Sequence, residues 1–281
     1  MSSAAGRLAL RSSFAVTSSV APRRAARRAA DLWFTVPRRA LPPSPAAPPG
    51  STSRTLTGDH GPIRVRSWGT GPVVCFMHGW GGNGDQVHGF VEPLIRRGLQ
   101  VVTFDAPGHG RSTARANSLS NATHFAHALG TVGAQYGPVQ TVIAHSLGAV
   151  ATMIANRNQW IRPERMVLIA PVTEVHSQLD RFADALAVSR RARQHLDTEV
   201  RRHTGLAIAD FSFSGRDAEP DRPTLLAVHD RHDRFVAHAN TAALVDSWPG
   251  ARLITTEGLG HVRILADPHV AEEVAIAVAG P

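Results

Sequence analysis

A chain of 281 residues can hold one large α/β domain or two small ones, and its hydrophobic content of 43% with 19% charged residues is ordinary for a globular protein. No stretch reaches the roughly 18 uncharged apolar residues that cross a bilayer, so we expect no membrane span. Of the net charge of +8, residues 1–50 contribute +7 with eight Arg against one acid, whereas the remaining chain has 22 Arg and 21 acids. The basic excess therefore belongs to a tail, and no nucleic-acid partner is expected.

The first fifty residues are rich in Arg, Ala, Ser and Pro and end in LPPSPAAPPG, which predicts a disordered or extended basic tail. A short docking helix is expected near residues 29–35, where three large apolar side chains follow one another (Leu32, Trp33 and Phe34). Met1–Val20 has the acid-free composition of an organelle transit peptide, although a frayed terminus or an early start codon explains it more simply. The single cysteine, Cys75, is compatible with a reducing compartment. We expect a cytoplasmic protein, with organelle targeting through the tail as the alternative.

From residue 51 the pattern becomes regular. Ile63–Trp68 alternates apolar and polar residues, as in a half-exposed antiparallel strand. Six later apolar runs are typical of strands buried on both faces of a parallel sheet: PVVCFMHG, QVVTFDAPGHG, TVIAHS, RMVLIAP, TLLAVHD and ARLITTEG. Helical patterns lie between them, at 86–97, 121–136, 148–157, 237–248 and 268–278. This alternation predicts a doubly wound, mostly parallel α/β sheet flanked by helices, formed by residues 51–171 and 223–281.

Residues 172–222 interrupt this alternation. The interval has no convincing strand, and its apolar residues recur at steps of three and four, which places one stripe along a helix (Val172, Val175, Leu179, Phe182 and Leu186). We expect a small helical cap or lid over the carboxyl edge of the sheet, where open α/β sheets bind ligands, and expect it to set acyl-chain preference. Five arginines of the insertion could steer anionic substrates, but a solvated helix face explains them better (Arg190, Arg191, Arg193, Arg201 and Arg202).

The segment TVIAHSLGAV places Ser146 between a strand and a helix that begins near Leu147. A nucleophile elbow, usually G-x-S-x-G, needs small residues two positions on either side of the serine, because strand and helix approach closely there. Gly148 meets this requirement, and Ala144 adds one methyl group. The alternative is an ordinary serine that caps the helix. The motif by itself leaves both interpretations open.

The glycine-rich segment MHGWGG closes the strand Val73–Met77. Its backbone amide at Trp80 can pair with that of Leu147 to bind a carbonyl oxyanion; the alternative is a glycine-rich loop without a catalytic role. His78, before the turn, is expected to be structural. Neither G-x-x-x-x-G-K-[ST] nor a clean G-x-G-x-x-G is present, which argues against phosphate binding.

Two segments near the end of the chain supply an acid and a base. TLLAVHDRHDRFV offers Asp230 and Asp233, and GLGHVRIL places His261 on a glycine-flanked loop. The chain order serine, acid, histidine is that of hydrolases with a nucleophile elbow, in which the histidine takes the serine proton and the acid orients the imidazole. Metal-ligand residue types cluster here, but adjacent residues after a strand point apart, so no metal is expected (His229, Asp230, His232 and Asp233).

Five motifs in this order, HGWGG, FDAPGHGRS, AHSLGA, HDRHDRFV and GLGHVRIL, together resemble the α/β-hydrolase fold superfamily over roughly residues 60–278. The family pattern G-x-x-D-x-x-V selects Asp233 as the acid, while His229 stands at the usual glycine, so Asp230 remains a minor contender. The resemblance also implies that Asp105 ties down the turn after its strand. A serine at position 146 disfavours haloalkane dehalogenase and epoxide hydrolase chemistry, which use an Asp nucleophile.

We therefore predict a serine hydrolase that cleaves a carboxylic ester or related acyl substrate through an acyl-enzyme intermediate. The expected catalytic residues are Ser146, Asp233 and His261, with the backbone N–H groups of Trp80 and Leu147 as the oxyanion hole. A small-molecule acyl substrate is the expected partner, and no cofactor is implied. The alternatives are a C–C bond hydrolase or a cofactor-free perhydrolase with the same triad, and a non-catalytic ligand-binding homologue. The sequence carries no signal for the physiological substrate or the oligomeric state.

Overall fold

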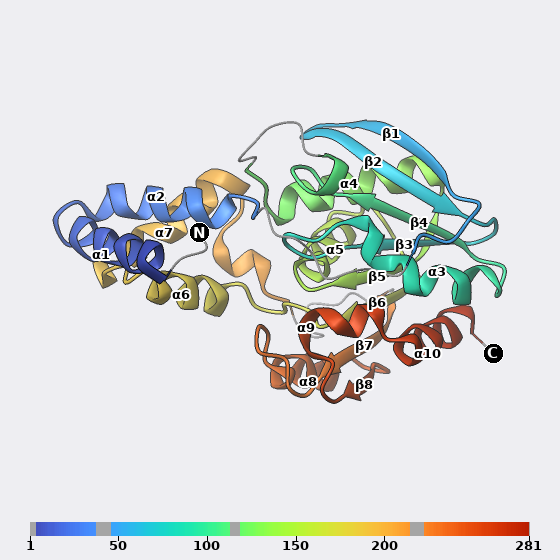
Figure 1. Ribbon diagram of the computed structural model, residues 1–281. Helices are drawn as coiled ribbons and strands as arrows, with labels where there is room; N and C mark the ends of the chain where they lie inside the picture. The colour runs from blue at the N-terminus through green and yellow to red at the C-terminus, as the bar shows by residue number, and fades with distance from the viewer. Residues whose placement is uncertain (1–3, 38–45, 113–118, 214–221, 281) are drawn as a thin grey trace. The chain divides into compact units, whose positions relative to one another are not determined.

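The computed structural model describes residues 4–37, 46–112, 119–213 and 222–280 (Figure 1). The chain divides into two compact units. The sheet unit consists of Val36–Thr173 and Phe213–Pro281, and the helical unit consists of Met1–Thr35 and Glu174–Ser212. Part of the expected Pro-rich stretch and part of the expected insertion, within 38–45 and 214–221, lie outside the described residues. None of the described helices is both long and apolar enough to cross a membrane.

The described residues of the sheet unit form one eight-stranded sheet in the order β1-β2-β4-β3-β5-β6-β7-β8. The strands are β1 (Thr52–Gly58), β2 (Gly61–Trp68), β3 (Val73–Met77), β4 (Gln100–Asp105), β5 (Val139–His145), β6 (Arg165–Ile169), β7 (Thr224–Asp230) and β8 (Arg252–Thr256). β2 runs antiparallel to both β1 and β4, and the pairs from β4 to β8 are parallel. The predicted mostly parallel, doubly wound sheet is thus confirmed.

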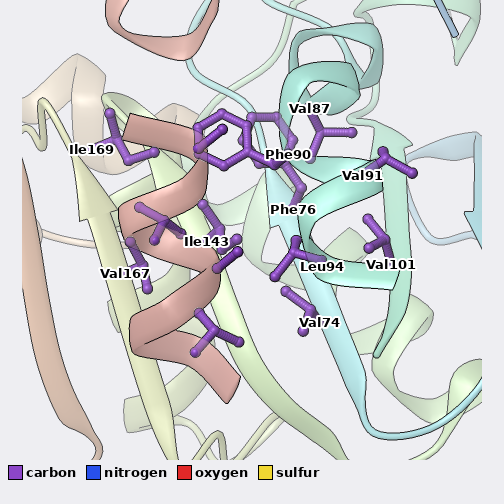
Figure 2. Packing of buried hydrophobic residues seen from close by; sticks show 14 of the residues in the cluster. Val74, Phe76, Val87, Phe90, Val91, Leu94, Val101, Ile143, Val167 and Ile169 are labelled. Atoms are coloured by element: carbon purple, nitrogen blue, oxygen red, sulfur yellow. The ribbon is translucent and has the colours of Figure 1, made fainter. Parts of the chain in front are cut away.

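Helices cover both faces of this sheet (Figure 1). They are α3 (His88–Ile95), α4 (Ala122–Tyr136), α5 (Leu147–Arg157), α8 (His238–Ser247) and α10 (Pro268–Ala279), with the short helices η1 (Gly84–Val87), η2 (Gly110–Ser112), α9 (Gly260–Arg263) and η5 (Ile264–Ala266). α3 packs against α10 on one side, and α4 packs against α5 on the other. Figure 2 shows the core on the α3 side, where Phe76 and Ile143 of the central strands meet Phe90 and Leu94 of α3. This buried layer fixes the strand ends that carry the candidate site.

The two edge strands differ from the sequence expectations. β1 was not predicted, because its residues are largely exposed and show no apolar alternation. ARLITTEG was predicted as a strand buried on both faces, but β8 is only partly buried, so that prediction is wrong. β8 has one neighbouring strand, β7, and therefore retains solvent access along its outer side.

The N-terminal residues are helical, so the prediction of an extended tail is wrong for 4–34. The helical unit contains α1 (Ala4–Val20), α2 (Pro22–Phe34), α6 (His176–Ala185), α7 (Arg190–Thr204) and η3 (Ile208–Phe211). α2 begins with Pro22 in its first turn, where proline is well tolerated, and its alanines form one buried stripe (Ala25, Ala26, Ala29 and Ala30). Small side chains allow α2 to pack closely on α7, which buries Ala192, Leu196 and Val200.

The docking helix expected near 29–35 is the end of α2, and it packs on helices of the insertion. The ring of Trp33 lies 5.1 Å from that of Phe182, and the ring of Phe34 lies 4.7 Å from that of His203. Arg11 of α1 donates to the carbonyl oxygens of Asp184 and Ala185 at the end of α6, at 3.1 Å each. Arg11 therefore connects α1 to the end of α6 within the helical unit.

Candidate active site

Ser146 occupies the sharp turn between β5 and α5. Its backbone has φ 53° and ψ −119°, in the left-handed half of the map, which is strained for a residue with a side chain. The side chain makes no capping hydrogen bond to α5, so the alternative of a helix-capping serine is wrong. Its Oγ instead lies 3.0 Å from Nε2 of His261. The strained turn directs the hydroxyl toward an imidazole.

The residues around Ser146 are small because backbone groups crowd the turn. A Cβ atom on Gly148 would lie 2.6 Å from the carbonyl oxygen of Met77, and one on Gly79 would lie 2.8 Å from Cβ of Ser146. Real Cβ atoms do not approach other atoms so closely. Ala144 is fully buried within β5, opposite Met77 and Leu168 in the sheet, where its methyl group fits. Glycine is therefore needed at position 148, two residues after the serine, and at position 79 in the neighbouring loop. Alanine is tolerated at position 144, two residues before the serine.

His261 lies in α9, a one-turn helix after β8, rather than in the irregular loop that was expected. Its Nδ1 is 2.6 Å from Oδ2 of Asp233, and its Nε2 faces Ser146. The backbone is held as well, because Nε2 of His145 donates to the carbonyl oxygen of His261 at 2.8 Å. Nδ1 therefore donates to the carboxylate, and Nε2 is left to accept the proton of the serine hydroxyl.

Asp233 has a completely buried side chain that accepts four hydrogen bonds. Oδ1 accepts from the backbone N–H groups of Phe235 and Val236, at 2.7 and 3.1 Å. Oδ2 accepts from Nδ1 of His261 at 2.6 Å and from Nε2 of His229 at 3.2 Å. Burial alone would raise the pKa of Asp233, but the bonds from His229, His261 and the backbone outweigh it and hold the pKa far below its ordinary value. The carboxylate is ionised in neutral solution.

Asp230, the contender for the acid, holds different partners. Its Oδ2 accepts from Oγ1 of Thr256 at 2.9 Å and from the backbone N–H of Leu259 at 2.8 Å, and its Oδ1 accepts from the backbone N–H of His232 at 3.0 Å. These bonds tie the segment before His261 to the end of β7. Asp233 is the carboxylate that contacts His261, as the family pattern indicated.

The loop with Trp80 is a tight turn beside the serine. Gly82 donates to the carbonyl oxygen of Gly79 at 3.0 Å, and Gly81 adopts a φ of 70°, which glycine tolerates without strain. Leu147 is the first residue of α5, where backbone N–H groups have no acceptor within the helix. Both amides thus come from segments next to Ser146, and their pairing as an oxyanion hole stays a prediction.

His78 is fully buried and links two loops. Its Nδ1 donates to the carbonyl oxygen of Gly79 at 2.8 Å, and its Nε2 accepts from the backbone N–H of Ala106 at 3.0 Å. Burial lowers the pKa of His78 to about 4, so the imidazole is neutral. These contacts are those of the structural residue that the sequence indicated.

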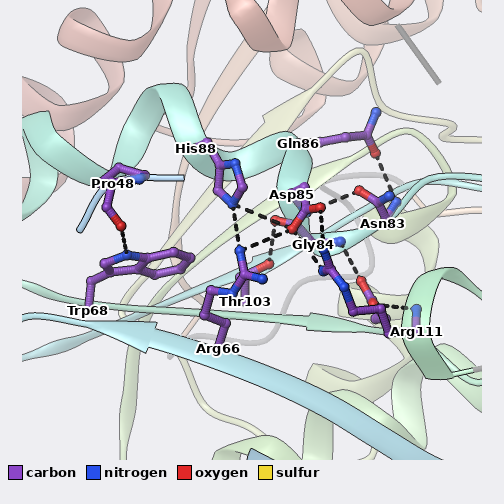
Figure 3. Close-up of polar contacts among 11 residues, drawn as sticks. Pro48, Arg66, Trp68, Asn83, Gly84, Asp85, Gln86, His88, Thr103 and Arg111 are labelled. Carbon is purple, nitrogen blue, oxygen red and sulfur yellow. Dashed lines mark hydrogen bonds and ion pairs between the residues drawn. The ribbon is translucent and has the colours of Figure 1, made fainter. Parts of the chain in front are cut away.

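The polar network in Figure 3 anchors the continuation of this loop. Asp105 accepts from the backbone N–H groups of Gly84 and Arg111, at 2.7 Å each, which is the structural role that the resemblance implied. Asp85 forms ion pairs with Arg66 at 3.3 Å and with Arg111 at 3.0 Å. The network joins β2, β4 and η1, and so fixes the loop that contains Trp80.

His229 is the contact that sequence reasoning missed. It was noted as a replacement for the usual glycine and among residues of metal-ligand type, yet its imidazole contacts the carboxylate of Asp233. A histidine four residues before the acid was the available signal. Within the described part of the chain, no group of three or more His, Cys, Asp and Glu side chains is arranged to hold a metal ion.

A model of the α/β hydrolase family matches residues 73–275, which span the sheet and all three residues of the Ser146–His261–Asp233 arrangement. The chain belongs to the α/β hydrolase family. This α/β hydrolase is 24% identical over 251 residues to a pimeloyl-acyl-carrier-protein methyl ester esterase of Aeromonas salmonicida, a match that covers 75% of this chain and 97% of the relative. It is 31% identical over 129 residues to a non-heme haloperoxidase of Rhodococcus erythropolis, which covers 45% of this chain and only 46% of that relative.

Solved structures share the fold at low identity. Est1E of Butyrivibrio proteoclasticus, determined with ferulic acid bound, has a TM-score of 0.61 at 17% identity and covers 80% of this chain and 96% of its own. A meta-cleavage product hydrolase from Pseudomonas fluorescens IP01 has a TM-score of 0.59 at 14% identity, with the same coverage of 80% and 96%. These likenesses establish the α/β hydrolase fold alone.

Proposed function

We propose that this α/β hydrolase is a serine hydrolase that cleaves a carboxylic ester, or a related acyl substrate, through an acyl-enzyme intermediate. One observation carries the proposal: the imidazole of His261 lies between Oγ of Ser146 at 3.0 Å and Oδ2 of Asp233 at 2.6 Å. These distances are within the range at which a base takes a proton from a nucleophile and an acid orients that base. The strained φ of Ser146 supports the same role.

In the proposed reaction, Oγ of Ser146 attacks the ester carbonyl carbon as Nε2 of His261 takes the hydroxyl proton. The carbonyl oxygen becomes an oxyanion, which accepts hydrogen bonds from the N–H groups of Trp80 and Leu147. The carbonyl forms again as the bond to the alcohol oxygen breaks, and His261 gives its proton to that oxygen. A water molecule then releases the acid by the same two steps, and Ser146 regains its proton.

An ester is the preferred substrate class because of the relative matched over 97% of its own length, whose name states a methyl ester as its substrate. The haloperoxidase match spans less than half of that relative, so perhydrolysis is the weaker alternative. C–C bond hydrolysis would use the same serine, histidine and aspartate. A non-catalytic homologue would not require the strained serine to face an imidazole.

A serine-directed fluorophosphonate probe tests the proposal. We expect the folded protein to be labelled at Ser146, and expect Ser146→Ala to abolish labelling and the hydrolysis of aryl esters. Ser53→Ala, at an exposed position of β1, is the matched control and should leave both unchanged. Unlabelled folded protein would rule out the proposed chemistry. Labelling without turnover of aryl esters of any acyl length would favour C–C hydrolysis instead.

We further propose that the insertion, residues 172–222, sets acyl-chain preference. The chain enters this insertion next to the nucleophile, because the backbone N–H of Val172 donates to the carbonyl oxygen of Ser146 at 3.2 Å. Farther along, the backbone N–H of Phe213 donates to the carbonyl oxygen of Thr173 at 3.1 Å. Exchange of residues 172–222 for the corresponding insertion of another α/β hydrolase should change the ranking of esters by acyl length, and an unchanged ranking would contradict the idea.

We also infer a cytoplasmic location, supported by the single cysteine, a buried thiol whose pKa burial raises to about 12. Cell fractionation with an antibody against the protein tests this. Enrichment in an organelle would favour the alternative of targeting through the N-terminal residues.

A further inference from the structure

His229 lies near the end of β7 and is completely buried. Its Nδ1 is 2.6 Å from Oγ1 of Thr241, a fully buried residue of α8, and its Nε2 is 3.2 Å from Oδ2 of Asp233. The same Oδ2 atom lies 2.6 Å from Nδ1 of His261. One carboxylate oxygen is thus shared by two imidazoles that face it from different elements.

The contacts of His229 determine where its proton lies. An ionised carboxylate only accepts hydrogen bonds, so Nε2 of His229 must carry a proton in order to bond to Asp233. A neutral imidazole carries one proton, and its other ring nitrogen is an acceptor. Nδ1 therefore has no proton and accepts from the hydroxyl of Thr241. The result is a directed series in which Thr241 donates to His229 and His229 donates to Asp233.

We propose that His229, with its tautomer fixed by Thr241, is a positioning residue for the Asp233–His261 pair. This inference rests on the proposed serine-hydrolase function and deepens it. The hydrogen bond from His229 keeps Oδ2 of Asp233 directed toward His261. The same bond stabilises the negative charge on Oδ2, so that this charge attracts the proton of His261 less strongly.

The other bonds to Asp233 do not replace this contact. The backbone N–H groups of Phe235 and Val236 both bond to Oδ1, so among the residues that the structure describes, loss of His229 leaves Oδ2 with His261 as its donor. A buried carboxylate that loses a donor becomes more basic and stabilises the protonated form of His261 more strongly. The base would then be unavailable over a wider range of acidic pH, and the carboxylate would be held less firmly.

The titratable groups around His229 come from each neighbouring element. Asp230 is next to it in β7, and Asp233 and His261 are the groups already described. From α8, the ring of His238 lies 5.6 Å away and its Nε2 bonds to Oγ1 of Thr255, the residue opposite His229 in β8, at 2.9 Å. Desolvation, and then the proximity of His229, lower the pKa of His238.

Three variants test the proposal. His229→Leu removes the donor at similar volume, His229→Gln offers an amide N–H in place of Nε2, and Thr241→Val removes the hydroxyl while keeping its shape. For an aryl ester, we expect His229→Leu to lower kcat about fivefold to tenfold and to change KM less than about twofold, since a hydrogen bond to a charged group is lost away from the substrate. We expect the acidic limb of the kcat/KM profile to move to higher pH by about half a unit. His229→Gln should restore most of the wild-type kcat and most of the wild-type position of the acidic limb. Thr241→Val should have values of both quantities between those of the wild type and His229→Leu.

If His229 had a purely structural role, His229→Leu would lower thermal stability without moving the acidic limb of the kcat/KM profile. His88→Leu is the matched control, because His88 is also a buried imidazole near a carboxylate, with its Nε2 3.5 Å from Asp85 (Figure 3). His88→Leu should lower Tm and leave the acidic limb of the profile in place.

Activities are expressed per active site, and the number of active sites is determined by fluorophosphonate titration. Failure of the wild type to label would refute the proposed function; normal labelling with unchanged kcat and pH limb in His229→Leu would overturn this inference alone. If His229→Leu does not fold, Thr241→Val decides by the same readouts.

Discussion

At the scale of single residues, the space around Ser146 limits which side chains are possible. Gly148 faces the carbonyl oxygens of Met77 and His78 so closely that an added methyl group must displace β3 or α5. Ala144, two residues before the serine, already carries such a methyl group without conflict. The two small residues of the elbow are therefore not equivalent in this protein.

Paired substitutions test this asymmetry. Gly148→Ala should lower the free energy of unfolding by about 1–3 kcal/mol through overpacking and should reduce kcat, because the turn holding Ser146 shifts. Ala144→Gly should cost no more than about 1 kcal/mol, from backbone entropy, and should leave kcat nearly unchanged. Urea unfolding and aryl-ester kinetics measure both. Equal effects of the two variants would contradict the steric explanation.

The two aspartates after β7 can be separated by the same kinetics. Asp233→Asn should reduce kcat by roughly 10³–10⁴-fold, as expected when a catalytic histidine loses the acid that fixes its tautomer. Asp230→Asn replaces one of two buried acceptor oxygens by an NH2 group, and should mainly lower stability, with kcat kept within about tenfold of the wild type. A larger loss of kcat from Asp230→Asn than from Asp233→Asn would reverse their assignment.

The sequence predicted Ser146, Asp233 and His261 because each stands in a short motif at the end of a strand. It did not predict the contact from His229, since the family pattern has a glycine there and no pattern reports a side chain that points back to a residue four positions later. Nor did it indicate that His145 holds the backbone of His261, because that contact joins residues 116 positions apart. Local motifs identify reacting groups, whereas their supporting contacts depend on tertiary packing.

At the scale of elements, α2 shows how composition can mislead. Its arginines and alanines suggested a solvated tail, but the alanines lie on one face of a helix and are buried, while Arg23, Arg24, Arg27 and Arg28 are exposed. The predicted helices of the sheet unit agree closely with the structure, because apolar periodicity is strong there. α2 has no large apolar stripe, so periodicity of hydrophobic residues gives no signal for it.

A charged residue on the buried face of α2 should detach this helix from α7. Ala29→Glu puts a carboxylate on the buried face of α2 and should destabilise the helical unit by about 3 kcal/mol or more. Arg24→Glu, at an exposed position of the same helix, is the control and should have little effect. Limited trypsin digestion reports the result, because α2 contains four arginines that cleavage reaches only when the helix detaches. Equal cleavage of the two variants would argue against the observed packing.

At the scale of the whole molecule, three buried imidazoles make stability depend on pH. Burial lowers the pKa of His78 to about 4 and the pKa values of His109 and His145 to about 3, from an ordinary value of 6.5. Between these values the unfolded chain binds protons that the native state does not. The free energy of unfolding therefore decreases as the pH falls below about 6.5. The low pKa of Asp233 removes further stability only below about pH 4.

We expect a loss on the order of 2 kcal/mol for each of these histidines between pH 6.5 and 5. Urea unfolding at a series of pH values measures the slope. His109→Asn keeps an N–H for the carbonyl oxygen of Pro107 and removes one titrating group, so its slope should be smaller than that of the wild type. A free energy of unfolding that stays constant over this range would show that the imidazoles are protonated in the native protein.

The sequence analysis did not predict that N-terminal helices and the insertion form one helical unit, in addition to a sheet unit in the same chain. The insertion was expected as a helical cap of its own, but α7 packs against α2, more than 150 positions earlier in the chain. Patterns within a window of a few turns carry no information on such pairing. Alternation of strands and helices, by contrast, repeats along the chain and was sufficient for the sheet.

The single, buried thiol makes it possible to place one fluorophore on each of the two units. Cys75 is buried in β3 with a strongly raised pKa, so it should remain silent toward maleimide reagents in the native protein. Leu8, 66% exposed on α1, and Ile276, 51% exposed on α10, belong to different units. Leu8→Cys with Ile276→Cys would accept a donor and an acceptor fluorophore without removal of any native cysteine. Energy transfer between the dyes would then report whether the distance between these two sites changes during turnover.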